Sequence, residues 1–168
     1  MGEPLSKKER AELLDESLEI LTGLWSGKPF HFEGTHYQVQ EMTFLPTPVQ
    51  QPRIPIWVVG GWKSEKSMAR ALRYDGVIPQ ILGAASGDNA SPEHIQAIKD
   101  YVNTHQDSSA PFDILAQGQT HPKPSHEAGD LVASYQQAGA TWWIEDWYLG
   151  PVEEGRKRLQ AGPPPLDA

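Results

Sequence analysis

One stretch decides the fold expected for this 168-residue chain: Ile54-Pro55-Ile56-Trp57-Val58-Val59-Gly60-Gly61-Trp62-Lys63-Ser64. Its apolar part, residues 54–59, is typical of a strand buried on both faces, as in a parallel sheet. A helical pattern at residues 65–74 follows directly. Glycines let the backbone approach a ligand, and a helix start offers free N–H groups. The stretch therefore predicts strand–loop–helix, with a loop that is either a phosphate cradle or an ordinary turn.

Similar units repeat through the rest of the sequence. The predicted strands are 54–59, 77–82, 112–117 and 140–144, and the predicted helices that follow them are 65–74, 91–105, 125–138 and 152–159. Strands that alternate with helices predict a parallel sheet with right-handed crossovers. Two α/β architectures fit this pattern: an open doubly wound sheet, or half of a (β/α)₈ barrel, which needs about 250 residues when complete.

The segment before these units has a different pattern. Ser6 and Glu9 open an amphipathic helix that we place within residues 1–27. Apolar residues that alternate with polar ones around a turn predict an irregular hairpin and a proline-rich linker at 28–53. We treat residues 1–168 as a single domain, with the four βα units at 54–161 and a tail at 162–168.

Composition excludes several classes of protein. The net charge is −8 and no basic patch stands out, so nucleic acid and anionic membranes are poor partners. The chain has no cysteine and its six histidines show no metal-ligand spacing, so we expect no metal site. No stretch is long and apolar enough to span a membrane, and we see no secretory leader. These features predict a cytoplasmic protein.

Ligands of parallel α/β proteins bind at the carboxyl ends of the strands. The candidate residues at these ends are Gly60, Gly61, Lys63, Ser64, Gln80, Gln119, Glu145 and Trp147. Such a set suits an aromatic cofactor that carries a phosphate, with backbone N–H groups and Lys63 at the phosphate and the glutamines and tryptophan near the ring.

Several residues at or near these strand ends also have a purely structural interpretation. Lys63 could be an ordinary surface lysine, and Glu145 and Asp146 could solvate a loop or cap the last helix. Trp57, Trp142 and Trp143 are expected in the core or against helices. These alternatives stay open from the residues alone.

Several segments resemble one family. They are Phe30-His-Phe-Glu-Gly34, Phe44-Leu-Pro-x-Pro-Val-Gln50, Pro55-Ile-Trp-Val-x-Gly-Gly61, Ala71-x-Arg-Tyr-Asp-Gly76 and Ala138-Gly-Ala-Thr-Trp-Trp-Ile-Glu-Asp146. Together they look like the luciferase-like monooxygenase superfamily, which includes bacterial luciferase, alkanesulfonate monooxygenase and deazaflavin-dependent reductases. The resemblance runs over nearly the whole chain.

The resemblance implies a (β/α)₈ barrel of which this chain has the C-terminal half, with its four strands in the places of strands five to eight. It implies FMN or a deazaflavin coenzyme as cofactor, with the phosphate near Gly60, Gly61, Lys63 and Ser64. The N-terminal half carries much of the flavin-ring pocket in the family and commonly the catalytic histidine. No residue here is assigned that role.

A half barrel has two free sheet edges and an uncovered inner face. Covering a few hundred Å² of apolar surface contributes on the order of 5–10 kcal/mol. We therefore expect association, either as a homodimer or with a separate N-terminal-half chain. The expected function is that of a luciferase-like oxidoreductase or its C-terminal portion, inactive without the missing half. The alternatives are a non-catalytic flavin-binding or dimerising module, or a truncated remnant.

Overall fold

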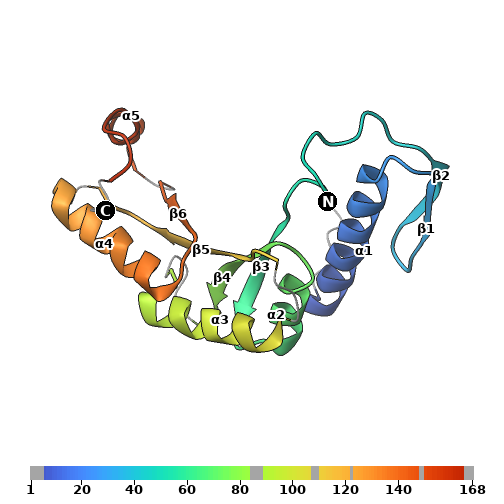
Figure 1. Ribbon diagram of the computed structural model, residues 1–168, viewed down its shortest axis with the longest axis horizontal. Helices are drawn as coiled ribbons and strands as arrows, with labels where there is room; N and C mark the ends of the chain where they lie inside the picture. The colour runs from blue at the N-terminus through green and yellow to red at the C-terminus, as the bar shows by residue number, and fades with distance from the viewer. Residues whose placement is uncertain (1–5, 84–88, 107–109, 122, 148–149, 165–168) are drawn as a thin grey trace. The chain divides into compact units, whose positions relative to one another are not determined.

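The computed structural model describes residues 6–83, 89–106, 110–121, 123–147 and 150–164 (Figure 1). The chain divides into two compact units, Met1–Pro55 and Ile56–Ala168. The first contains α1 (Lys7–Trp25), β1 (Phe30–Glu33) and β2 (Gln38–Met42). The second contains β3 (Trp57–Trp62), α2 (Glu65–Ala71), β4 (Gly76–Ile81), α3 (Pro92–His105), β5 (Asp113–Gly118), α4 (Ser125–Ala138), β6 (Trp142–Glu145) and α5 (Val152–Gln160).

Helix α1 of the first unit begins at the predicted cap. The Ser6 hydroxyl accepts a hydrogen bond from the backbone N–H of Glu9 at 3.0 Å, which satisfies one of the free amides of the first turn. At the other end the chain turns through Gly27, whose φ is +68°. Glycine adopts this left-handed conformation without strain, so the helix ends where the sequence predicted.

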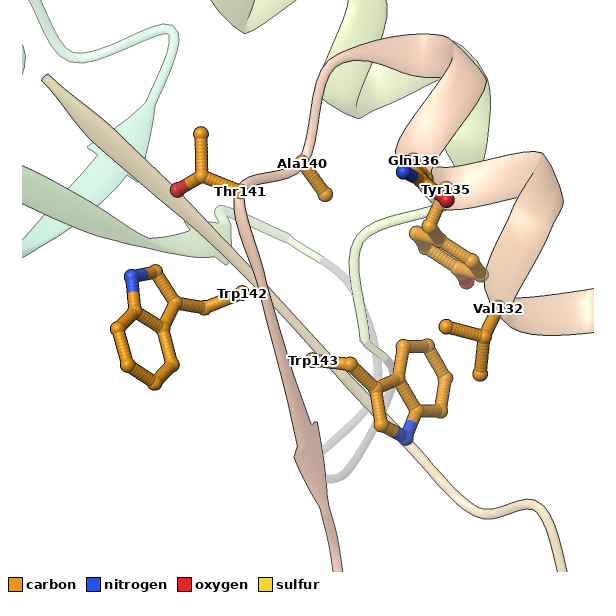
Figure 2. Close-up of a pocket in the computed structure, with 7 residues that line it drawn as sticks. All are labelled: Val132, Tyr135, Gln136, Ala140, Thr141, Trp142 and Trp143. Atoms are coloured by element: carbon orange, nitrogen blue, oxygen red, sulfur yellow. The ribbon is translucent and has the colours of Figure 1, made fainter. Parts of the chain in front are cut away.

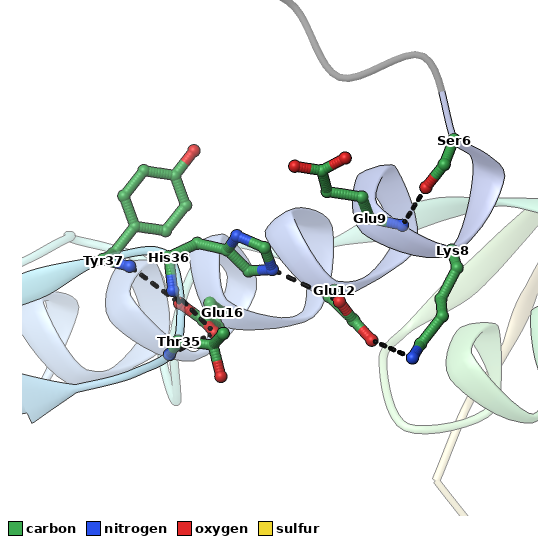
Figure 3. A network of polar contacts seen from close by, with 8 residues as sticks. All are labelled: Ser6, Lys8, Glu9, Glu12, Glu16, Thr35, His36 and Tyr37. Carbon is green, nitrogen blue, oxygen red and sulfur yellow. Dashed lines mark hydrogen bonds and ion pairs between the residues drawn. The ribbon is translucent and has the colours of Figure 1, made fainter.

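The hairpin of β1 and β2 is antiparallel and has an irregular register between Phe30 and Phe32. Its turn is tied to α1 by one carboxylate. Glu16 accepts hydrogen bonds from the backbone N–H groups of Thr35, His36 and Tyr37 at 2.8, 3.0 and 2.9 Å (Figure 3). The irregular hairpin predicted from the sequence is therefore confirmed, and α1 holds its turn in place.

In the second unit the four strands form one parallel sheet in the order β3-β4-β5-β6. Helices α2, α3 and α4 lie along one face of this sheet (Figure 1). The apolar core lies between them and includes Val58, Val77 and Ile114 from the strands and Met68 and Ile98 from the helices, each at most 3% exposed. The predicted half of a (β/α)₈ barrel is confirmed as a four-stranded parallel sheet alternating with helices.

The opposite face of the sheet carries large apolar side chains that remain exposed. Val59 and Trp142 are 53% and 52% exposed. Trp142 lies against Trp57, with ring centroids 5.1 Å apart, and the Trp57 indole N–H donates to Asp113 at 3.0 Å. The expectation that Trp142 lies in the core or against a helix is wrong, because no helix among the described residues of the second unit covers this face of the sheet. Trp143 points to the other side and packs on Tyr135 of α4, as expected.

Strand β3 begins three residues later than predicted, at Trp57 rather than residue 54. Pro55 has no N–H to contribute to a ladder. The N–H of Ile56 instead donates to the Asp75 carboxylate at 2.6 Å, and the N–H of Asp75 donates back to the Ile56 carbonyl at 3.0 Å. At its other end the strand extends through Gly60 and Gly61 to Trp62, whereas the sequence placed both glycines in the following loop.

The two glycines are needed for packing inside the strand. A Cβ at Gly60 would lie 2.5 Å from Cγ2 of Val77 and 3.0 Å from Sδ of Met68. A Cβ at Gly61 would meet the side chain of Leu82 at 3.2 Å. Val77 and Met68 are buried, whereas Leu82 is 53% exposed and can move aside.

This difference predicts unequal effects of two matched substitutions. Gly60→Ala should lower the free energy of unfolding by about 1–3 kcal/mol, because the core has to rearrange around the new methyl group. Gly61→Ala should lower the free energy of unfolding by clearly less, because the exposed Leu82 side chain can move aside. Chemical denaturation of both variants measures the difference. Equal losses of stability would contradict this packing argument.

The Glu16 contacts predict a pH-sensitive hairpin. Burial raises the pKa of Glu16, but the three backbone donors outweigh it and hold this pKa below its ordinary value of 4.5. The stabilisation is therefore fully present above pH 4.5 and is lost as the pH falls through the lowered pKa. Glu16→Ala should accelerate amide exchange at residues 35–37 near neutral pH. Glu19→Ala, on an exposed position of the same helix, is the control and should leave these amides unchanged.

Candidate functional site

The carboxyl ends of β3 to β6 form a common rim at one end of the sheet, because all four strands are parallel. The structure distributes the predicted residues along this rim. Gly60 and Gly61 lie in β3, Gln80 in β4 and Glu145 at the end of β6. Lys63 and Ser64 follow β3, Gln119 follows β5, and Trp147 lies two residues beyond β6.

The turn after β3 presents a lysine but fewer free amides than the sequence suggested. Lys63 is exposed and has a φ of +70°, which is unusual for a residue with a side chain. Ser64 precedes α2, and its hydroxyl does not cap the helix. The N–H of Gly61 is already bonded to the Ser67 hydroxyl at 2.9 Å. The Lys63 side chain and the Ser64 hydroxyl therefore remain available to an anion. The amides of Gly61 and Ser64 have partners within the protein, since the Ser64 N–H donates to the Gly61 carbonyl at 3.0 Å.

The two predicted glutamines are exposed on the rim. Gln80 pairs in register with Gly61 on the neighbouring strand, so both lie on the face of the sheet that the helices leave uncovered. Gln119 follows β5 and is also exposed. An exposed amide can both donate and accept hydrogen bonds, so these side chains can contact polar groups of a ligand.

Glu145 is at the centre of a hydrogen-bond network at the end of β6. It accepts bonds from the Thr120 N–H and hydroxyl, both at 2.8 Å, from the Trp143 indole at 3.0 Å, and from Nε of Arg158 at 3.2 Å. Burial raises the pKa of Glu145, but these donors together hold it below the ordinary value of 4.5. The carboxylate thus joins the ends of β5 and β6 to α5.

Arg158 was not identified from the sequence. It lies in α5 and its side chain is only 14% exposed. Its Nε donates to the Thr120 hydroxyl at 3.1 Å as well as to Glu145, and its Nη1 donates to the Gly162 carbonyl. A basic residue in a short polar helix carries no local sign of this role, because its side-chain partners Glu145 and Thr120 are 13 and 38 positions away along the chain.

Two adjacent residues beyond β6 carry buried polar atoms without partners. Asp146 is 6% exposed, and its Oδ2 accepts a bond from the Asn89 amide at 2.8 Å. Its Oδ1 and the indole N–H of Trp147 have no hydrogen-bond partner in the described part of the chain. The interpretation of Asp146 as a loop-solvating residue is therefore wrong. Buried polar atoms are normally satisfied, so both atoms are candidates for contact with a group that the described residues do not supply.

A hollow of about 260 Å³ lies elsewhere, at the amino end of β6 (Figure 2). Tyr135 and Val132 of α4 border it together with Trp143, whereas Trp142 points away on the other side of the strand. The Tyr135 and Trp143 rings meet edge to face at 5.2 Å. Because this hollow lies at the opposite end of β6 from the rim, we attribute it to packing at the sheet edge and not to cofactor binding.

Comparison with known proteins gives a family and distant relatives. The luciferase-like monooxygenase family model matches residues 1–161. An uncharacterized protein of Mycobacterium tuberculosis is 36% identical over 76 residues, which are 45% of this chain and 24% of that protein. The FMNH₂-dependent dimethylsulfone monooxygenase of Pseudomonas putida is 33% identical over 70 residues, which are 41% of this chain and 19% of that protein. The matched segments thus span a quarter or less of these relatives.

The network around Glu145 predicts the effect of removing its charge. Glu145→Gln should lower the free energy of unfolding by about 1–3 kcal/mol, because Arg158 loses its ionic partner in a largely buried place. In the wild type this stabilisation is present above pH 4.5 and is lost as the pH falls through the lowered pKa of Glu145. The variant should therefore lose less stability on acidification.

Denaturation curves measured between neutral and acid pH test this expectation. Glu154→Gln is the control, because this glutamate is exposed on α5. Equal stability of Glu145→Gln and Glu154→Gln would show that the network does not hold the end of β6.

Proposed function

Because the chain belongs to the luciferase-like monooxygenase family, we propose that it is the C-terminal half of a flavin-dependent oxidoreductase barrel. One observation carries this proposal: four parallel strands in sequential order, with helices on one face and a polar rim at their carboxyl ends. The FMNH₂ dependence of one distant relative supports FMN over a deazaflavin as the cofactor. The absence of cysteine from the chain is in keeping with a cytoplasmic location.

The residues of the rim fit part of a flavin mononucleotide. Lys63 and the Ser64 hydroxyl are available to a phosphate after β3. Asp146 Oδ1 could accept a bond and the Trp147 indole could donate one to polar groups of the cofactor. Gln80 and Gln119 are weaker candidates for the ring or the substrate. The flavin would supply hydride or electron transfer and oxygen activation, and the protein would supply position and electrostatics.

Other predicted contacts act indirectly in this proposal. Gly60 and Gly61 allow β3 to pack closely against Val77 and Leu82, and so place the turn that carries Lys63. The carboxylate oxygens of Glu145 accept hydrogen bonds from Thr120, Trp143 and Arg158. These bonds fix the chain just before Asp146 and Trp147. These residues would position the rim and would not touch the cofactor.

We further propose that a complementary half with four more parallel strands covers the exposed face of the sheet. Val59 and Trp142 are about half exposed there, and strands β3 and β6 each have a free edge. A free edge of a parallel sheet is closed when another strand pairs with it, as in a complete barrel. The N-terminal half of a related barrel fits this role, and a second copy of the chain is the alternative that the test below distinguishes.

The first test combines size measurement with flavin titration. The chain alone should self-associate in light scattering, bind FMN weakly and show no flavin-dependent substrate oxidation. Co-expression with the N-terminal half of a longer relative should give a one-to-one complex that binds FMN more tightly. A stable monomer that neither binds FMN nor forms this complex would refute the proposal. A homodimer that binds FMN as tightly alone as in the presence of the N-terminal half would identify the second copy as the covering half.

The second test concerns the phosphate contact. Lys63→Ala keeps a Cβ at the residue with positive φ, so the backbone strain is unchanged while the charge is lost. It should weaken FMN binding by roughly tenfold, which corresponds to about 1.4 kcal/mol. Lys66→Ala, an exposed lysine of α2, is the matched control and should bind like the wild type. Unchanged affinity of Lys63→Ala for FMN would remove Lys63 from the site.

A further inference from the structure

A second concave surface lies between the loop after β5, the start of α4 and the end of α5. Its volume is about 330 Å³, at the small end of the range for ligand sites. Its polar lining consists of Thr120, His121, Lys123, Ser125, Lys157 and Arg158. The strand order places it far along the sheet from Lys63, because Lys63 follows β3 at one edge and this cavity adjoins β5 and β6 at the other.

Positive charge is concentrated in this cavity, although the chain as a whole carries a net charge of −8. Lys123 comes from the loop before α4 and Lys157 from α5. Neither lysine forms an ion pair within the described residues. No aspartate or glutamate is among the described residues that line the cavity. Two lysines held on one cavity without an acid between them repel each other, and a bound anion would remove that cost.

Hydrogen bonds hold the side chains that form the wall behind the two lysines. The guanidinium of Arg158 is fixed by the Thr120 hydroxyl at 3.1 Å and by Glu145 at 3.2 Å, which also offsets part of its charge. Thr120 is 2% exposed. Ser125 adds a hydroxyl, and the first turn of α4 has no side-chain cap because Pro124 precedes it. The cavity thus combines two exposed lysines with the Ser125 hydroxyl, which suits a small anion with several acceptor oxygens.

We propose that this cavity binds the phosphate group of a small molecule, with Lys123 and Lys157 supplying the charge and Ser125 a hydrogen bond. A phosphate monoester carries about −1.5 to −2 charges at neutral pH, which two lysines match. Lys123, Lys157 and Ser125 are not among the residues assigned to the flavin. The cavity does adjoin one of those, because the His121 ring of its lining lies edge to face against Trp147 with ring centroids 5.6 Å apart. Two sources of the phosphate share this chemistry: the phosphate of FMN and that of a different small molecule.

Titration of inorganic phosphate into the full chain tests the proposal. Calorimetry at neutral pH and low ionic strength should show saturable binding, and chloride at the same ionic strength should not reproduce it. The double variant Lys123→Ala/Lys157→Ala should bind phosphate about tenfold more weakly or worse. Lys66→Ala serves as the control for a lost surface charge and should bind as the wild type does. Circular dichroism checks that the double variant is folded.

Two results would overturn the proposal: no saturable binding by the wild type at millimolar phosphate, or equal binding by the wild type and the folded double variant. An FMN titration in the presence of phosphate identifies the source. Competition would assign the cavity to the phosphate of FMN, whereas simultaneous binding would assign it to another phosphate compound. Phosphate binding without any FMN binding would support the cavity while contradicting the proposed flavin function, so the two failures are distinguishable.

Discussion

A parallel sheet has to be covered on both faces, because its strands are apolar on both sides. Among the described residues of the second unit, helices cover one face of the β3–β6 sheet, where α2, α3 and α4 lie. The other face leaves Val59 and Trp142 half exposed. This asymmetry governs the rest of the unit: the helix side has a close-packed core, whereas the open side and the two free edges account for the exposed aromatic surface.

Carboxylates at the junctions between elements hold this chain together. Glu16 ties the hairpin turn to α1, Asp75, directly before β4, ties the start of β3 to the start of β4, and Glu145 ties β6 to α5. Asp113 likewise accepts bonds from Trp57 and from the Thr141 hydroxyl. Each acidic side chain receives donors that would otherwise be unsatisfied, and a hydrogen bond to a charged acceptor is among the stronger ones. These four of the chain's 22 acidic residues therefore have a structural role.

The sequence predicted the order of the elements because apolar periodicity and helix stop signals are local. It placed the start of β3 too early, because an apolar run does not reveal that the Asp75 carboxylate, 19 positions away, accepts the hydrogen bond of the Ile56 N–H. The same limit explains the site. Lys63 and Gln80 could be placed on the rim from strand order alone, whereas Arg158 and the buried state of Asp146 depend on partners 13 to 57 positions away. Local patterns contain no sign of such contacts.

The unsatisfied features of the second unit are of two kinds. Apolar side chains such as Val59 and Trp142 are half exposed on the open face. The polar atoms Asp146 Oδ1 and Trp147 Nε1 have no hydrogen-bond partner among the residues that the structure describes. Exposed apolar side chains are stabilised when another protein surface covers them, and a second set of strands would bury this apolar area. The second kind calls for directed hydrogen bonds, which a polar ligand can make. A complementary half would serve both needs, because a closed barrel would bury the open face and enclose the rim where a cofactor binds.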